Sequence, residues 1–385
     1  MRILHVIPSL NPDTGGPPMV AARLAAAQAA LGCRTAVVAY EFPHAQANVA
    51  TALSKVPQME RVKLHYLPPL SRVERFLARG GKERLKPLIA EADLVHLHGV
   101  WDPLIYRAAG VACENRKPYV LTPHGMLDPW AVAQKAWKKK IALNLGYRRM
   151  LNNAAFLHYL NSEEQELTKP LRLTSRGEVL PNGIFLEEID PLPARGTFRP
   201  ARPEIGDRPF VLFLSRLHYK KGLDYLADAM AIAMKRFAEL QLVVAGPDDG
   251  ARAAFEAQIR TLGISDRVHL IGPVYGVAKL AALVDCDCFC LPSRQEGFSL
   301  AITEAMACEA PVVISQACHF PEVTDANAGI VCELNAAKVA AGLETILADP
   351  TASRQMGRRG RDLVVSRYTW PAVATQMVAA YERVV

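Results

Sequence analysis

Residues 288–306 read CFCLPSRQEGFSLAITEAM, and this stretch decides the fold class. The apolar run CFCL predicts a short buried strand, and the proline, glycine and polar residues after it predict a loop. Ser299 is a residue type that favours helix N-caps, so the apolar residues that follow it predict a helix beginning there. A buried strand followed closely by a helix is the repeating unit of a parallel sheet with helices on its faces.

The same alternation extends through the rest of the chain. In the second half, strands are predicted at 210–215, 240–246, 267–274, 311–315 and 328–332, and helices at 223–237, 251–262, 335–348, 352–366 and 370–385. In the first half, strands are predicted at 2–10, 35–40, 92–99, 119–125 and 156–160, and helices at 19–31 and 131–153, with Gly32 as a stop signal. Residues 188–209 hold five prolines and no periodic apolar face, which predicts a linker.

The predicted fold class is therefore α/β, with two doubly wound, Rossmann-like parallel-sheet domains facing each other across a cleft. The domains are expected to span 1–190 and 191–369. A length of 385 residues also favours two domains. Ligands of such sheets bind outside the carboxyl ends of the strands, so the loops that follow strands are the places to search for a site.

Composition excludes some classes of protein. The formal net charge is +7, half of the residues are hydrophobic, and no run of 18 apolar residues exists, so no membrane span is expected. The start MRILHVIPSLNP resembles a first strand more than a secretory signal, and eight irregularly spaced cysteines do not form a disulfide framework. These features favour a cytoplasmic protein. Cys286, Cys288 and Cys290 are interpreted as buried residues on one face of a strand rather than as metal ligands, and no metal is expected.

Charged residues gather in two loops that follow strands of the second domain. Arg216 and Lys221 lie between a strand and a helix, where two cations beside a helix N-terminus would bind a diphosphate. Glu296 lies in the loop of the opening stretch, and Glu304 lies about 7 Å along the helix after it. Two carboxylates that flank an anion site suit a nucleotide sugar, which has hydroxyl groups on both sides of its diphosphate.

In the first domain, Gly16 precedes a helix and would let the backbone approach a phosphate, although the dinucleotide fingerprint G-x-G-x-x-G is absent. His124 directly follows a strand, at a place where a substrate would lie. Trp101, Asp102 and Trp130 lie in the neighbouring loops, where the indole rings would either stack on a sugar or pack internally. The two glutamates are also compatible with the acid/base pair of a glycosidase, but such an enzyme does not need the two cations.

Several segments together resemble one family. Arg-x4-Lys-Gly at 216–222, Glu-x7-Glu at 296–304, LPNG at 180–183, VLFLSRL at 211–217 and LVVAGP at 242–247 resemble the retaining glycosyltransferases of family GT4, which have the GT-B fold. The resemblance implies an N-terminal acceptor-binding domain, rejoined by the helix at 370–385, and a C-terminal domain that binds the nucleotide sugar. It also implies transfer with retention and without a bound metal, because the departing phosphate itself helps to deprotonate the acceptor.

The resemblance further implies a role for each matching residue. Arg216 and Lys221 would hold the diphosphate, Glu296 and His124 the donor sugar, and Glu304 the ribose. The backbone at Gly16 and at Gly297, Phe298, Ser299 and Leu300 would contact the phosphates, and the segment from Ile271 to Val274 would contact the base.

The expected function is transfer of a hexose from a UDP- or GDP-sugar to a glycan acceptor, lipid-linked, in biosynthesis of an exopolysaccharide or O-antigen type of polysaccharide. A nucleotide-sugar hydrolase or epimerase of the same fold, and a binding protein without catalysis, are the alternatives. Residues 135–149 contain lysines, arginines and interleaved apolar residues but no acid, which suits peripheral contact with an anionic membrane at its inner face. Nucleic acid is not an expected partner, because no binding motif accompanies the charge.

Overall fold

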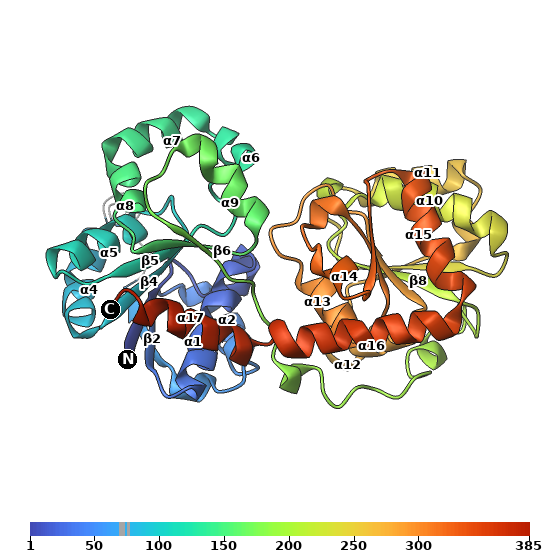
Figure 1. Cartoon of the computed structure of the whole chain (residues 1–385), viewed down its shortest axis with the longest axis horizontal. Helices are drawn as coiled ribbons and strands as arrows, with labels where there is room; N and C mark the ends of the chain where they lie inside the picture. Colours follow the sequence, from blue (N-terminus) through green and yellow to red (C-terminus); the bar gives the residue numbers. More distant parts are fainter. Residues whose placement is uncertain (69–73, 75–77) are drawn as a thin grey trace. The chain divides into compact units, whose positions relative to one another are not determined.

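The computed structural model describes residues 1–68, 74 and 78–385. The chain divides into two compact units, residues 1–183 with 370–385, and residues 184–369. Each unit is an α/β sandwich around a parallel sheet, as the alternation of strands and helices predicts (Figure 1).

The sheet of the first unit has the strand order β3-β2-β1-β4-β5-β6-β7, all parallel. In that order its strands are Lys63–Leu67, Arg34–Tyr40, Arg2–Val6, Leu94–His98, Tyr119–Thr122, Phe156–Tyr159 and Gly177–Val179. Its helices are α1 Pro17–Ala30, α2 Gln46–Leu53, α4 Arg79–Glu91, α5 Pro103–Glu114, α6 Pro129–Ala133, α7 Ala136–Ala142, α8 Arg148–Asn152, α9 Ser162–Thr168 and α17 Trp370–Glu382. Figure 1 shows the last helix, α17, lying beside α1, and the two helices are in contact.

The two faces of this sheet differ in character. One face packs Leu4, Val95 and Leu121 against α4 and α5 in an apolar core. The opposite face carries buried histidines on β1, β4 and β6, below α1 and α17. Buried polar side chains must find partners inside the protein, so this second face depends on a hydrogen-bond network rather than on apolar packing alone.

The sheet of the second unit has the strand order β10-β9-β8-β11-β12-β13, also parallel. In that order its strands are Val268–Gly272, Gln241–Ala245, Phe210–Leu214, Cys288–Leu291, Val312–Ser315 and Gly329–Cys332. Its helices are α10 Leu223–Arg236, α11 Arg252–Thr261, α12 Gly276–Asp285, α13 Leu300–Ala307, α14 Glu322–Asp325, α15 Ala336–Ala348 and α16 Pro350–Arg367. Helix α10 packs against α11 and α15, and helix α13 packs against α12 and α16. The continuous apolar strands are buried because helices cover both faces.

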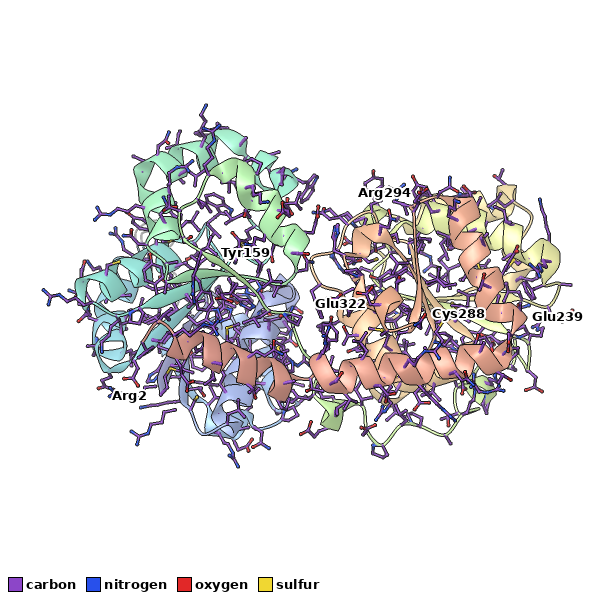
Figure 2. All side chains as sticks on the ribbon, in the orientation of Figure 1. Arg2, Tyr159, Glu239, Cys288, Arg294 and Glu322 are labelled. Carbon is purple, nitrogen blue, oxygen red and sulfur yellow. The ribbon has the colours of Figure 1, made fainter. Side chains whose placement is uncertain are left out.

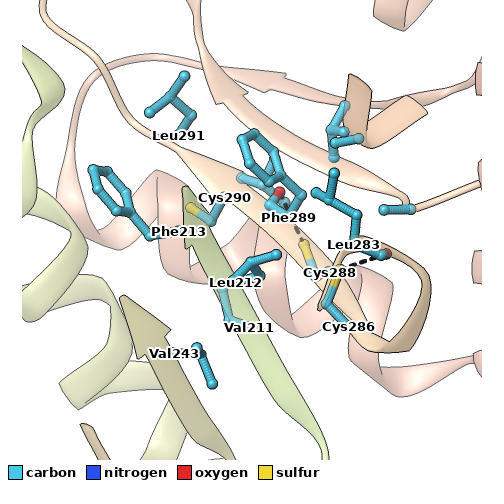
Figure 3. Close-up of a cluster of buried hydrophobic side chains, with 14 of the residues drawn as sticks. Val211, Leu212, Phe213, Val243, Leu283, Cys286, Cys288, Phe289, Cys290 and Leu291 are labelled. Carbon is cyan, nitrogen blue, oxygen red and sulfur yellow. Dashed lines mark hydrogen bonds between the residues drawn. The ribbon is translucent and has the colours of Figure 1, made fainter. Parts of the chain in front are cut away.

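The cysteines of the second unit lie in its apolar core. Cys288 and Cys290 on β11 are buried among Leu212, Phe213 and Leu283 (Figure 3). Burial raises the pKa of each of these two thiols well above its usual value, which suits inert packing residues. The prediction that Cys286 shares their strand face is wrong, because Cys286 is the C-cap residue of α12 and its thiol contacts the Leu283 carbonyl oxygen.

Two further predictions are corrected by the structure. The helix expected over 131–153 is divided into α6, α7 and α8, because Lys135 (φ 55°) and Gly146 (φ 123°) leave the right-handed helical region. The proline-rich segment expected as a linker is packed on the core of the second unit, where Phe198 and Ile205 are buried. The backbone N–H groups of Gly196 and Phe198 donate to the Asp285 carboxylate at 2.5 and 2.7 Å.

A candidate sugar-nucleotide site

The loop after β8 is pressed against the loop after β11. Gly222 ends this first loop with φ 69°, and a Cβ atom there would lie only 1.8 Å from the carbonyl oxygen of Pro292. Only glycine fits such a conformation and such a close approach. Arg294, labelled in Figure 2, strengthens the contact because its guanidinium binds the Asp224 carboxylate at 2.8 and 2.5 Å and lies 4.2 Å from the Tyr219 ring centroid. Two segments that are about 75 residues apart thus form one rigid surface at the strand ends.

Lys221 and Glu296 meet on this surface. The Lys221 ammonium donates to both carboxylate oxygens of Glu296, at 2.7 and 2.9 Å, and the Ser293 hydroxyl donates to Oε1 at 2.6 Å. The two charged side chains are only 15% and 8% exposed. The Glu296 N–H also donates to the Ala317 carbonyl, so both the backbone and the side chain of this glutamate are held in place.

Helix α13 begins beside these two residues. Ser299 is its N-cap residue, as predicted, but the serine side chain makes no capping hydrogen bond to the helix. The N–H groups of the first turn therefore donate no hydrogen bond to the N-cap side chain, and they carry the positive end of the helix dipole. Together with Lys221, a helix start of this kind suits a phosphate group.

Glu304 and Arg216 each have an oppositely charged partner that the sequence did not suggest. Glu304 on α13 pairs with Lys279 on α12 at 2.8 Å. Arg216, which is 64% exposed after β8, pairs with Asp249 in the loop after β9 at 2.5 Å. Neither partner belongs to a motif, so neither pairing has a signal in the sequence.

The segment from Ile271 to Val274 includes the last two residues of β10 and the start of the loop after it, at the same carboxyl edge of the sheet. Both of these side chains are partly buried against the core of the second unit. These two apolar residues and the four charged residues Arg216, Lys221, Glu296 and Glu304 are candidates for binding an elongated ligand, at its middle and at its two ends.

In the first unit, His124 follows β5 with the left-handed backbone conformation φ 52°. Its imidazole Nε2 lies 3.2 Å from Nδ1 of His98 on β4. The next residue, Gly125, donates its N–H at 2.5 Å to the buried carboxylate of Glu164, which also accepts from Leu160. Burial raises the pKa of Glu164. This glutamate was not among the predicted site residues, although Asn161 and Glu164 have the spacing of a capping box.

The other candidates of the first unit have different surroundings. Gly16 is exposed and is the N-cap residue of α1. Asp102 caps α5 by accepting from the Leu104 N–H at 2.8 Å, so it has a structural role, and burial raises its pKa. Trp101 is also packed, because its indole N–H donates to the Met126 carbonyl at 3.0 Å. Trp130 is exposed on α6.

Buried histidines form the one group of potential metal ligands found among the described residues. Ligand atoms of His5, His96 and His98 lie within 4.8 Å of one another. All six ring nitrogens of these three residues already have hydrogen-bond partners in the protein. A metal ion would have to displace these contacts, so the arrangement is that of a hydrogen-bond network.

Comparisons with known proteins agree on one family. Residues 195–363 match the family described as "Glycosyl transferases group 1", and residues 14–188 match "Glycosyltransferase Family 4". The chain is 36% identical over 169 residues to an MMP alpha-(1->4)-mannosyltransferase of Mycolicibacterium hassiacum, covering 43% of this chain and 40% of that protein. It is 27% identical to the phosphatidyl-myo-inositol mannosyltransferase of Mycobacterium leprae, covering 84% of this chain and 79% of that protein.

Solved structures show the same fold. The structural alignment with the Anabaena protein HepE, in complex with UDP and glucose, covers 100% of both chains, with a TM-score of 0.76 and 18% identity. The sucrose-phosphate synthase of Thermosynechococcus elongatus covers 100% of this chain and 98% of that protein, with a TM-score of 0.75 and 21% identity. Two parallel-sheet units, the two family matches and these neighbours lead to one conclusion: the chain belongs to the glycosyltransferases of family GT4 and has the GT-B fold.

Proposed function

We propose that this protein transfers a hexose from a UDP- or GDP-sugar to a glycan acceptor, lipid-linked, with retention of the anomeric configuration. The observation that carries the proposal is the nearly buried cluster of Lys221, Glu296 and Ser293 beside the start of α13. It places a cation, a hydroxyl-binding carboxylate and helix N–H groups next to one another. The second unit would accordingly bind the nucleotide sugar and the first unit the acceptor.

The proposed roles follow the chemistry of each group. Lys221, Arg216 and the N–H groups at 297–300 stabilise the negative charge that develops on the diphosphate as the sugar leaves. Glu296 binds hydroxyls of the donor sugar, because its carboxylate still has lone pairs beyond those used by Lys221 and Ser293. Glu304 binds the ribose hydroxyls in the same way.

The remaining proposed contacts are with the base, the sugar and the phosphates of the donor. Ile271 and Val274 provide an apolar surface for the base, His124 binds a hydroxyl of the sugar, and the exposed backbone at Gly16 approaches the phosphates. Because cations and helix N–H groups neutralise the leaving group, we propose that transfer needs no metal ion. The departing phosphate oxygen then takes the proton of the acceptor hydroxyl on the face where the donor bond breaks, and this gives retention.

The comparisons support the substrate class. HepE was crystallised in complex with UDP and glucose, and other relatives are named as mannosyltransferases that act on phosphatidyl-myo-inositol or on MMP. A further structural neighbour, WaaG, is a glycosyltransferase involved in lipopolysaccharide biosynthesis and has a TM-score of 0.68. These relatives favour an acceptor in polysaccharide or glycolipid biosynthesis for this chain as well.

The test is incubation with UDP- and GDP-sugars, with and without extracts of lipid-linked glycans, in the presence of EDTA. We expect free UDP or GDP to appear only when acceptor is present, and the anomeric proton coupling of the product to match that of the donor. Loss of donor without acceptor would instead identify a hydrolase or epimerase. Tight binding of a sugar nucleotide without any turnover would identify a binding protein.

We also propose that the first unit contacts an anionic membrane surface through α7 and the turn after it. Trp137, Ile141 and Leu145 follow one another at helical spacing and are 65%, 48% and 73% exposed. Lys138 and Lys140 lie between these apolar side chains in the sequence. Exposed apolar side chains flanked by lysines are typical of helices that lie in the membrane interface. In the part of the chain that the structure describes, no helix is both long and apolar enough to cross a bilayer.

Sedimentation with vesicles that contain anionic lipid tests this contact. Replacing Lys138 and Lys140 by glutamate should lower vesicle binding about 10-fold or more, because each cation near the surface contributes ~1 kcal/mol. The matched control is the same change of charge at the exposed residues Lys55 and Lys63, which should leave binding unchanged. Equal sedimentation of both variants would exclude α7 as the contact.

A further inference from the structure

Five buried or partly buried histidines form a row across the sheet of the first unit. His5 on β1 is the register partner of His96 on β4, and His98 follows two residues later on the same face. Thr122 on β5 is the register partner of His98, and His158 on β6 lies beside Thr122. His124, the proposed sugar-binding residue, ends the row at the carboxyl edge of the sheet.

Hydrogen bonds connect this row with two helices into a single chain. His124 Nε2 meets His98 Nδ1 at 3.2 Å, and His98 Nε2 meets His5 Nδ1 at 3.0 Å. His5 Nε2 meets the Gln28 side chain on α1 at 2.8 Å, and Gln28 meets the Tyr381 hydroxyl on α17 at 3.3 Å.

The chain continues from α17 back into the sheet. The Tyr381 hydroxyl meets His96 Nδ1 at 2.6 Å, and His96 Nε2 meets the Thr122 hydroxyl at 2.6 Å. Thr122 then meets His158 Nδ1 at 2.8 Å, and His158 Nε2 meets the Leu180 carbonyl at 2.8 Å.

The Leu180 carbonyl, at one end of the chain, determines which atom donates and which accepts in every hydrogen bond of the chain. A carbonyl oxygen only accepts, so His158 carries its proton on Nε2 and its Nδ1 must accept. Thr122 has a single hydroxyl proton, which it donates to His158, so it accepts from Nε2–H of His96. By the same reasoning, Nδ1 of His96 accepts from the Tyr381 hydroxyl.

The same assignment of donors and acceptors extends through Gln28 to His124. Tyr381 has used its proton, so it accepts from the amide N–H of Gln28, and the amide oxygen of Gln28 accepts from Nε2–H of His5. His5 Nδ1 accepts from His98, and His98 Nδ1 accepts from Nε2–H of His124. Each histidine in the chain, when neutral, therefore carries its single proton on Nε2.

Burial supports the neutral form throughout the chain. It lowers the pKa of His5 and of His158 to about 4 and that of His124 to about 3, and it holds the pKa values of His96 and His98 well below their usual range. At every ring nitrogen that has a partner within the chain, an additional proton would leave two donors facing each other, and at the open Nδ1 of His124 burial alone opposes protonation.

We propose that this chain of hydrogen bonds fixes the tautomer of His124, so that Nδ1 of its imidazole can only accept a hydrogen bond. This atom then selects a donor sugar that presents a hydroxyl group to it. This inference rests on the proposed function for the identity of the ligand, but not for the tautomer. Nε2–H of His124 is already used by His98, so any hydrogen bond to a ligand must come from Nδ1. A carboxylate, which only accepts, would face a nitrogen lone pair and be disfavoured. The site would therefore take a neutral hexose and reject a uronic acid. Gln28 and Tyr381 are positioning residues in this scheme.

The direct test is NMR of protein labelled with ¹⁵N-histidine, because the ¹⁵N shifts of an imidazole distinguish its two tautomers. We expect His124 to be fully in the Nε2–H form at neutral pH. In Tyr381→Phe the amide of Gln28 is no longer held, and it can rotate to donate to His5. The bonds from His5 to His124 can then reverse, so a second His124 signal with Nδ1–H should appear.

Tyr119→Phe is the matched control, because it also removes a buried tyrosine hydroxyl of the first unit, one that donates to the Met150 carbonyl outside the chain. It should leave the His124 tautomer unchanged. Thr122→Val is a second way to separate His124 from the Leu180 end, should Tyr381→Phe not fold. An Nδ1–H tautomer in the wild type, unchanged His124 signals in both chain variants, or stoichiometric zinc in the purified protein would each overturn the inference.

Binding of sugar nucleotides gives the functional readout. In a thermal-shift assay, the neutral sugar nucleotide that the wild type uses should stabilise it. The matching uronic acid derivative should bind at least 10-fold more weakly. Tyr381→Phe should raise KM for the donor about threefold to tenfold with little change in kcat, because it weakens one hydrogen bond to the sugar. Equal stabilisation by both donors would contradict the specificity. If no sugar nucleotide binds at all, the proposed function fails, while the tautomer result stands by itself.

Discussion

Lys221→Ala is expected to lower kcat/KM for sugar transfer about 10³-fold, since removing a single preorganised donor from a developing oxyanion already costs about 10²–10³. Lys221 is nearly buried beside α13, where a charge interacts more strongly than it does in open water. The matched control is Lys220→Ala on the same turn, whose ammonium contacts Gln295 at 2.8 Å. That variant should stay within about threefold of the wild type, as is usual for changes away from a site.

The variant needs a control for folding, because Lys221→Ala leaves the carboxylate of Glu296 nearly buried and without its ammonium. We expect this to destabilise the second unit by about 3 kcal/mol. The double variant Lys221→Ala/Glu296→Ala removes both charges, so it should regain part of this stability while remaining inactive. A stable double variant without activity separates the chemical role of the pair from its structural role. Near-normal turnover of Lys221→Ala or of Glu296→Ala alone would refute the site.

The first unit is expected to unfold on mild acidification. Its five linked histidines have an unfolded pKa near 6.5 and a lower pKa in the folded state, so the unfolded chain binds more protons below that pH. The stability that the neutral histidines provide is therefore present above pH 6.5 and is lost as the pH falls toward about 4. Between pH 7 and pH 5.5 each histidine should contribute a loss on the order of 1 kcal/mol, so the five together should cost several kcal/mol.

Such a loss is comparable with the whole stability of a typical domain, ~5–15 kcal/mol. The buried Glu164 acts in the opposite sense, because its pKa is raised in the folded state: as the pH falls, the folded state takes up a proton there before the unfolded chain does and gains stability.

Tryptophan fluorescence reports on this unit alone, since Trp101, Trp130, Trp137 and Trp370 all lie within it. Urea titrations followed by this signal should show a large decrease in the midpoint between pH 7 and pH 5.5. Hydrogen exchange of β8, β9 and β11 in the second unit should change much less over the same range. A midpoint for the first unit that does not depend on pH would mean that the histidines are not held neutral.

The fold was predictable from local sequence because each strand of the second unit is a continuous apolar run followed by a turn and a helix. The same locality made Lys221, Glu296 and the start of α13 visible, since each lies five to nine residues after a strand end. The segmentation of 131–153 was not predictable, because the bend at Gly146 depends on a packing contact: a Cβ atom there would lie 2.5 Å from the Tyr106 hydroxyl.

The histidine chain was hidden for a different reason. Gln28 and Tyr381 are 353 residues apart, and their contact depends on α17 packing on α1. The sequence shows single histidines at several strand positions, but only the register of β1, β4, β5 and β6 places them in one row. The pairs formed by Glu304 with Lys279 and by Arg216 with Asp249 likewise require tertiary structure.

A crystal structure with bound UDP or GDP tests the central claim most directly, which is that Lys221 and the N-terminus of α13 hold the diphosphate. We predict phosphate oxygens within hydrogen-bonding distance of the Lys221 ammonium and of N–H groups at 297–300, with the ribose hydroxyls on Glu304. A nucleotide bound elsewhere on the chain, with Lys221, Glu296 and the start of α13 untouched by it, would contradict the account.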